Sequence, residues 1–184
     1  MPEVRQGARY ARFPIEIATL GLAMARQQMG QHFLKDLGWR KRILETLPRG
    51  DEENWLEIGA GHGEMTELLV AEGRRVVAVE ADAKLTEGLR ARAEDWGKVE
   101  IVAGDILKLD LKKIFQGKFR VYGNLPYYIT SPILHHLFEY ADGIASIHIV
   151  IQLEVAARIV APPGRRDYGY LSAFCQYYAR PKIV

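Results

Sequence analysis

Short apolar runs that favour β-strands alternate along this chain with longer stretches that favour helices. Such alternation predicts an α/β fold, with a mostly parallel sheet covered by helices on both faces and ligands at the carboxyl ends of the strands. The expected strands cover residues 54–58, 75–80, 99–103, 119–123 and 144–151, and the expected helices cover residues 36–47, 64–72, 83–95, 131–140 and 168–179. Another strand is expected to open at Lys182, so the last strands should be incomplete.

The first expected strand runs into a glycine-rich turn, Trp55-Leu56-Glu57-Ile58-Gly59-Ala60-Gly61-His62-Gly63-Glu64. Gly59 and Gly61 allow a sharp turn and a close approach of a ligand to the backbone. The position that needs the third glycine of a dinucleotide fingerprint is occupied by Glu64, whose charge would repel a pyrophosphate. The pattern instead resembles the first motif of S-adenosylmethionine-dependent methyltransferases.

Two acidic residues follow the next two expected strands. Glu80 lies nineteen positions after Gly61, where a carboxylate can accept both ribose hydroxyls of a nucleoside ligand. Asp105 can accept a hydrogen bond from an adenine amine, while Ile106 packs on the ring. Glu80 could also be a helix N-cap or a surface acid, and Asp105 an ordinary residue at a strand-to-loop junction.

The tetrapeptide Asn124-Leu125-Pro126-Tyr127 follows the fourth expected strand. Pro126 fixes its own φ and keeps Leu125 out of the helical region, so the turn should be stiff. The amide oxygen of Asn124 and the carbonyl of Leu125 can accept both N–H bonds of an exocyclic amine, while Tyr127 stacks on the ring that carries it. These four residues are the candidate catalytic set, although an ordinary loop with a proline would look similar.

From about Gln28 onward, the chain resembles the KsgA-type ribosomal RNA adenine dimethyltransferases, with the Erm methyltransferases as close relatives. The resemblance is carried by Gly30-Gln31-His32-Phe33-Leu34, Leu56 to Gly63, Glu80, Gly104-Asp105-Ile106-Leu107, Asn124-Leu125-Pro126-Tyr127-Tyr128-Ile129-Thr130-Ser131-Pro132 and Gln152-Leu153-Glu154-Val155-Ala156. It implies a Rossmann-like class I methyltransferase that transfers methyl groups from S-adenosylmethionine to N6 of adenines in small-subunit ribosomal RNA. It also implies that Gln31, His32 and Leu34 close over the cofactor, which Asn124 contacts as well.

Two alternatives stay open beside this reading. One is an Erm-type enzyme acting on large-subunit RNA, and the other is a catalytically silent module that binds cofactor or RNA during ribosome assembly. Family members normally continue through a closing hairpin, a Phe-x-Pro-x-Pro loop and a small helical domain. Residues 26–184 are therefore expected to be a truncated methyltransferase domain that captures cofactor better than it engages RNA.

Composition narrows the expected partners. The formal charge of +2 gives no strong global field, but basic residues cluster before the glycine-rich turn and near the end of the chain, where they could contact RNA phosphates.

One cysteine excludes an internal disulfide, and no Cys/His grouping has metal-ligand spacing. His62, His135 and His136 are interpreted as surface or satisfied histidines. A monomer that binds the small ribosomal subunit and no metal is expected.

The first 25 residues precede the family resemblance. Arg5, Arg9 and Arg12 stand before a mildly apolar run, an order that imitates a signal peptide, but Pro14 and Glu16 interrupt it. A disordered or weakly helical extension is expected here, with Met24 a candidate start and a transit peptide a minor alternative. No stretch is long and apolar enough to span a membrane, and a cytoplasmic location is expected.

Overall fold

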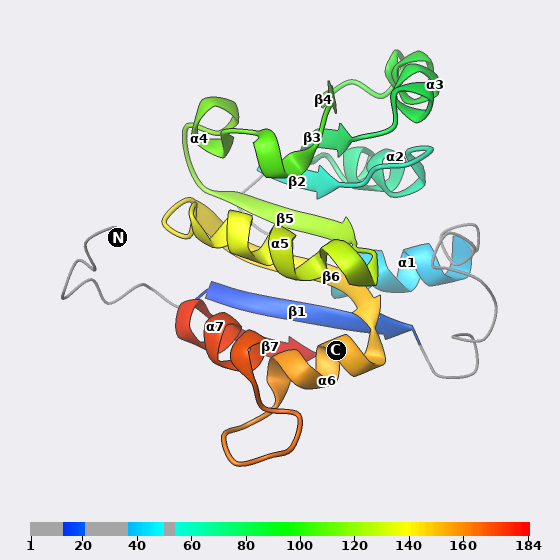
Figure 1. Ribbon diagram of the computed structural model, residues 1–184. Coiled ribbons are helices and arrows are strands. Elements are labelled where there is room, and N and C mark those ends of the chain that lie inside the picture. Colours follow the sequence, from blue (N-terminus) through cyan, green and yellow to red (C-terminus); the bar gives the residue numbers. More distant parts are fainter. Residues whose placement is uncertain (1–12, 21–36, 50–53) are drawn as a thin grey trace.

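The computed structural model describes residues 13–20, 37–49 and 54–184. Within these ranges, seven parallel strands form one sheet in the order β4-β3-β2-β5-β6-β1-β7 (Figure 1). The strands are β1 Phe13–Leu20, β2 Asn54–Ile58, β3 Arg75–Glu80, β4 Val99–Ala103, β5 Phe119–Asn124, β6 Ile144–Gln152 and β7 Ala179–Ile183. The prediction of a mostly parallel sheet is confirmed.

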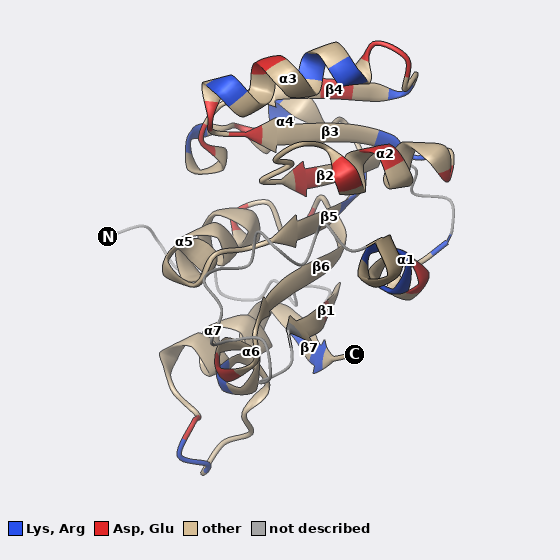
Figure 2. Ribbon diagram, turned by 90° about the vertical axis from the view of Figure 1, so that its right-hand side faces the viewer, with Lys and Arg blue, Asp and Glu red and all other residues tan. Residues whose placement is uncertain are grey.

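Helices cover both faces of the sheet, as Figure 2 shows from the side. The helices are α1 Leu37–Thr46, α2 Glu64–Ala71, α3 Ala83–Ala93, η3 Ile106–Lys108 (a 3₁₀ turn), α4 Leu111–Ile114, α5 Tyr127–Phe138, α6 Leu153–Val160 and α7 Tyr170–Tyr178. Helices α1 to α3 cover one face, and α4 to α7 cover the other. Each face has its own apolar core.

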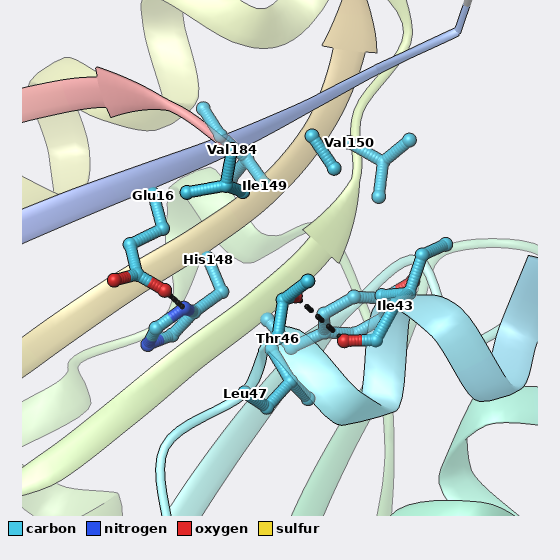
Figure 3. A pocket seen from close by; sticks show the side chains of 10 residues that line it. Glu16, Ile43, Thr46, Leu47, His148, Ile149, Val150 and Val184 are labelled. Atoms are coloured by element: carbon cyan, nitrogen blue, oxygen red, sulfur yellow. Dashed lines mark hydrogen bonds and ion pairs between the residues drawn. The ribbon is translucent and has the colours of Figure 1, made fainter.

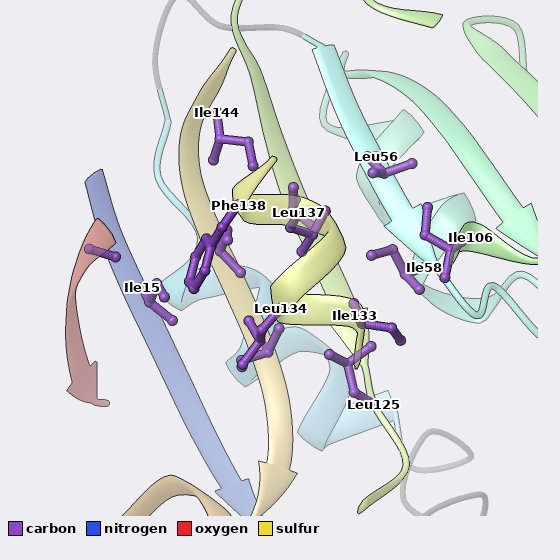
Figure 4. Close-up of a cluster of buried hydrophobic side chains, with 14 of the residues drawn as sticks. Ile15, Leu56, Ile58, Ile106, Leu125, Ile133, Leu134, Leu137, Phe138 and Ile144 are labelled. Carbon is purple, nitrogen blue, oxygen red and sulfur yellow. The ribbon is translucent and has the colours of Figure 1, made fainter. Parts of the chain in front are cut away.

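The central strands are buried on both faces, which explains their almost continuously apolar sequences. In β6, Ile147, Ile149 and Ile151 face the larger core, and Val150 faces the smaller one. Helix α5 packs Leu134 and other apolar side chains against this larger core (Figure 4). Full burial of each such side chain contributes roughly 1.5–3 kcal/mol to folding.

Most expected elements are present, with differences at their ends. Helix α5 begins at Tyr127, four residues before the expected start, and Pro132 lies inside it. Proline is most common in the first turn of a helix, so Pro132 in the sequence favours a later start than the structure has. Helix α6 was not expected, and β7 begins at Ala179, three residues before the expected opening at Lys182.

The interpretation of residues 1–25 as a disordered or weakly helical extension is wrong for Phe13–Leu20, which form strand β1. This strand lies between β6 and β7 and is parallel to both. Phe13, Ile15 and Ile17 are buried in the larger core, in the two-residue period of a strand. Pro14 and Glu16 fall on the alternate positions, so the residues taken as interruptions of an apolar run mark the other side of a strand.

None of the helices in residues 13–20, 37–49 and 54–184 is both long and apolar enough to cross a membrane.

Candidate functional site

The glycine-rich turn after β2 leaves open space where a ligand can approach. Gly59, Gly61 and Gly63 have φ angles of 72°, 59° and 85°, in the left-handed region that favours glycine. A Cβ atom built on Gly59 or Gly61 would meet no heavy atom within 4 Å. On Gly63 it would lie 2.4 Å from Leu89 and 2.6 Å from Trp96. The first two glycines therefore border a cradle, while Gly63 permits close packing of α2 against α3.

Glu80 ties this cradle to the end of β3. Its Oε2 accepts a hydrogen bond from the Gly61 N–H at 2.8 Å, and its Oε1 accepts one from the Asp82 N–H at 2.9 Å. The carboxylate is 9% exposed, so it is held in place with free lone pairs beside the glycine turn. Asp82, not Glu80, is the N-cap of α3, which removes the capping alternative for Glu80.

Asp105 follows β4 at the same edge. The preceding Gly104 donates its N–H to the Glu80 carbonyl at 2.9 Å, which joins the ends of β3 and β4. The Asp105 carboxylate accepts a hydrogen bond from the Leu107 N–H at 3.0 Å and so caps the 3₁₀ turn. Ile106 is buried in the larger core, where it supports this corner from below.

The Asn124–Tyr127 turn connects β5 to α5. The Leu125 N–H donates to the Val150 carbonyl at 3.0 Å, and the Leu125 side chain is buried. The hydroxyl of Thr130 donates to the Pro126 carbonyl at 2.9 Å. The turn is therefore anchored on both sides, while the Tyr127 ring remains 57% exposed. An exposed ring on a fixed backbone suits stacking on a planar ligand.

Strand register places these residues side by side. Ile58 pairs with Val79 of β3 and with Gly123 of β5, so the residues that follow each strand meet at the carboxyl edge of the sheet. Gly59, Glu80 and Asn124 are thus brought together from three neighbouring strands. Gln31, His32 and Leu34 lie outside the described residues. Among the residues that the structure describes, no cluster of three His, Cys, Asp or Glu side chains could hold a metal ion.

A row of polar side chains crosses the sheet one step below this edge, and sequence reasoning missed it. Backbone register aligns Glu57 of β2, Tyr122 of β5, His148 of β6, Glu16 of β1 and Lys182 of β7. We call these five residues the polar row. A single acid inside the otherwise apolar Trp55–Ile58 run is the sequence signal that could have indicated it.

The inner end of the polar row is completely buried. Burial raises the pKa of Glu57 to about 8, because a carboxylate charge is disfavoured where water is excluded. Burial also raises the pKa of Tyr122. Glu57 Oε2 and Tyr122 Oη have no hydrogen-bond partner among the described residues. Glu57 stands two positions before Gly59, and Tyr122 two positions before Asn124, so both lie directly under the cradle.

The outer end of the polar row is centred on Glu16, which forms an ion pair with Lys182 and lies beside His148. Glu16 Oε2 lies 3.2 Å from His148 Nδ1, and Glu16 Oε1 lies 2.8 Å from Lys182 Nζ. Burial lowers the pKa of His148 to about 4, against the opposing effect of the Glu16 carboxylate. Figure 3 shows Glu16 and His148 at a small cavity beside α1.

The fold and the site together define a Rossmann-like class I methyltransferase. A family model described as ribosomal RNA adenine dimethylase matches residues 23–184. The chain belongs to this family. It is 40% identical over 158 residues to ribosomal RNA small subunit methyltransferase A of Psychrobacter cryohalolentis, covering 83% of this chain and 55% of that protein. The methyltransferase A of Ligilactobacillus salivarius is 37% identical over 190 residues, covering all of this chain and 63% of the relative.

Solved structures agree with this assignment. The 23S rRNA methyltransferase ErmE has a TM-score of 0.62 and 31% identity, over 72% of this chain and 53% of that one. A dimethyladenosine transferase from Plasmodium falciparum has a TM-score of 0.63 and 24% identity, over 74% of this chain and 49% of that one, and shows the shared fold. The chain thus spans about half to two thirds of the length of these relatives.

Proposed function

We propose that this chain binds S-adenosylmethionine and transfers its methyl groups to N6 of adenines in small-subunit ribosomal RNA. The observation that carries the proposal is the juxtaposition of two sites at one edge. The Gly61–Glu80 corner is suited to a nucleoside, and the Asn124–Tyr127 turn is suited to a planar ring with an amine. The family membership and the names of the curated relatives support the same reading.

The geometry at Gly59, Gly61, Glu80 and Asp105 supports the proposed cofactor site. The open space at Gly59 and Gly61 accommodates the methionine end, and the fixed carboxylate of Glu80 has lone pairs left for the ribose hydroxyls. The Asp105 carboxylate accepts one hydrogen bond, from the Leu107 N–H. Its remaining lone pairs can accept a hydrogen bond from the adenine amine. The cofactor, when bound, supplies a methyl group on a sulfonium centre.

The catalytic turn orients the target amine. Asn124 and the Leu125 carbonyl accept its two N–H bonds, which favours a pyramidal nitrogen whose lone pair faces the methyl carbon. The cofactor would supply the methyl group to this nitrogen, and its sulfur would keep the electron pair of the C–S bond that breaks. The cationic nitrogen then loses a proton to water. Catalysis rests on orientation and on preorganised acceptors rather than on a strong base.

The target adenine must leave its stack to reach this turn. Stacking on the exposed ring of Tyr127 offsets part of the cost of flipping the base out. Dimethylation requires exchange of spent cofactor between two transfers. We further propose that the chain acts as a monomer in the cytoplasm, where small ribosomal subunits and the cofactor are both present.

The test is a radiolabelled methyl-transfer assay on small ribosomal subunits that lack the modification, with a parallel calorimetric titration of the cofactor. Asn124→Ala should lower turnover at least tenfold and leave cofactor affinity nearly intact, whereas Glu80→Ala should weaken cofactor binding. Equal loss of turnover and cofactor affinity in Asn124→Ala would contradict its assigned role. Cofactor binding without any methyl transfer by the parent chain would favour a silent binding module.

An Erm-type specificity is the second candidate, because ErmE shares 31% identity with this chain. The same assay on large ribosomal subunits distinguishes the two. Label that enters only the large-subunit RNA would support the Erm-type reading. We expect label in the small-subunit RNA, since the curated relatives named above are small-subunit methyltransferases.

A further inference from the structure

Three nearly parallel aromatic rings lie on the outer side of α5 and α7, away from the catalytic turn. His135 of α5 lies face to face on Phe174 of α7, with ring centroids 3.8 Å apart. Tyr170, at the start of α7, lies alongside both rings, with centroids 5.6 Å from each and interplanar angles of 10° and 15°. Its hydroxyl is 3.2 Å from His135 Nε2. We call His135, Tyr170 and Phe174 the aromatic platform.

The platform is supported from below. Phe174 also contacts Phe138 and Tyr178, with centroid distances of 5.2 Å and 5.3 Å, so the rings continue into the larger core. An aromatic cluster of this kind usually only fills a core. Here, however, Tyr170 is 68% exposed although its ring is aligned with two others. A large, orderly and exposed ring binds a planar ligand with little loss of conformational freedom.

Helix α5 connects the platform to the catalytic turn. Tyr128, in its first turn, is 80% exposed. His135 lies seven residues later, which is two helical turns, and therefore falls on the same side of the helix about 10 Å further along. A single-stranded segment whose target base enters at Tyr127 can thus follow this side of α5, and its neighbouring nucleotides come to the aromatic platform.

Positive charge lies on the loop that leads into α7 and its platform residues. The loop between α6 and α7 carries Arg165 and Arg166, both exposed, five and four residues before Tyr170, and Arg158 stands in the last turn of α6. Asp167 is the only acid from Arg158 to Tyr170. The Tyr168 N–H donates to the Arg165 carbonyl at 3.0 Å, so the loop is a formed turn. Figure 2 shows these charges on the loop that projects from α6 and α7.

We propose that the aromatic platform, together with Arg165 and Arg166, is a second contact site for single-stranded RNA beside the target adenine. An unpaired base stacks on the platform, chiefly on Tyr170, and the two arginines contact its flanking phosphates. Aromatic stacking with adjacent basic residues is the usual way in which proteins hold single-stranded nucleic acid. The proposal rests on the proposed function, because it assigns the RNA strand to a defined path along α5.

The experiment measures binding of the full chain to a fluorescent RNA hairpin whose loop contains unpaired adenines, by fluorescence polarisation. Tyr170→Ala should weaken binding roughly 5- to 100-fold, as expected for the loss of one base–aromatic stack. Tyr170→Phe keeps the ring and should stay within about twofold of the parent chain. Tyr177→Ala is the matched control, because Tyr177 is 58% exposed on the same helix but is not part of the platform.

Salt dependence separates stacking from charge. Arg166→Ala should reduce the slope of log affinity against log salt by about one, whereas Tyr170→Ala should leave that slope unchanged. Cofactor titration of every variant should match the parent chain. If Tyr170→Ala binds the hairpin as tightly as Tyr177→Ala does, the platform is only packing or a protein-facing surface, and this proposal is overturned while the proposed function stands. Absence of cofactor binding by the parent chain would instead overturn the proposed function.

Discussion

The two wings of the sheet are built in different ways. The wing β4-β3-β2 consists of strands that are neighbours in sequence, each joined to the next through a helix, and it carries the cradle and Glu80. The wing β6-β1-β7 joins the first described strand to the last two, and it carries the outer end of the polar row around Glu16. The first wing positions a ligand through local turns, whereas the second depends on contacts between distant segments. The two wings belong to one sheet and differ in whether their pairings are local or long-range in sequence.

The largest effect is expected from removal of β1, which tests whether folding depends on the wing β6-β1-β7. Deletion of residues 1–23 takes away the strand between β6 and β7 and exposes the adjoining edges of both. We expect loss of cooperative folding, or aggregation, measured by circular dichroism and size-exclusion chromatography.

The matched control is deletion of residues 1–11, which retains all of β1 and should leave the melting temperature within a few degrees. A stable monomer after deletion of residues 1–23 would show that β1 is dispensable and that the two wings do not differ as described.

A second test addresses the wing β4-β3-β2, which carries the glycine turn. Gly63→Ala places a Cβ atom against Leu89 and Trp96 at a left-handed φ, and should destabilise the fold by about 2–4 kcal/mol in urea denaturation. Gly73→Ala has a similar φ of 83° but no neighbour within 4 Å, and should cost only about 1 kcal/mol. Equal effects at the two positions would mean that α2 and α3 adjust freely.

The inner end of the polar row should make stability depend on pH. The pKa of Glu57 is raised from 4.5 to about 8. Between these two pH values the native state therefore keeps a proton that the unfolded state releases. The contribution of Glu57 to the free energy of unfolding is therefore largest below pH 4.5. It falls as the pH rises toward 8, by at most about 1.4 kcal/mol per pH unit.

Glu57→Gln mimics the protonated side chain and should gain stability over the parent chain as the pH rises from 5 to 8, as measured by urea denaturation. Glu100→Gln, at an exposed position of β4, is the control and should show a constant difference. A pH-independent difference for Glu57→Gln would mean that Glu57 is ionised in the native state.

The smallest effect is expected at the outer end of the polar row. Lys182 is 59% exposed, so Lys182→Ala should lower stability by less than about 1 kcal/mol. Glu16→Gln should cost more, about 1–2 kcal/mol, because Glu16 contacts both His148 and Lys182. Thermal denaturation of both single variants and the double variant gives their coupling. Additive losses would show that the pair contributes nothing.

The wing β4-β3-β2 was predictable because its sequence signals are local. A buried strand, a glycine turn and a helix follow one another around Gly59, and Glu80 stands at a fixed spacing from Gly61. The carboxyl-edge position of these residues then follows from parallel topology alone. The stiff turn at Pro126 was predictable for the same reason, because proline acts on its own backbone and on the residue before it.

The rest of the molecule depends on pairings that no local pattern contains. Glu16 read as an interruption of an apolar run, because its partners His148 and Lys182 lie in strands near the other end of the chain. His135 was interpreted as a surface or satisfied histidine, and its stacking partner Tyr170 is thirty-five residues away. Each of five strands contributes one member of the polar row, and only the strand order β2-β5-β6-β1-β7 aligns them.

The position of β1 in the sheet also affects the order in which the strands can pair during synthesis. Ile15 pairs with Ile147, about 130 positions later, and Phe13 pairs with Ala179. At translation rates of roughly 5–20 residues per second, β1 leaves the ribosome on the order of ten seconds before its neighbours. During that interval β2 to β5 can assemble, whereas Phe13, Ile15 and Ile17 have no native sheet to join. The first described strand is therefore among the last to dock, and such long-range pairing is intrinsically slow.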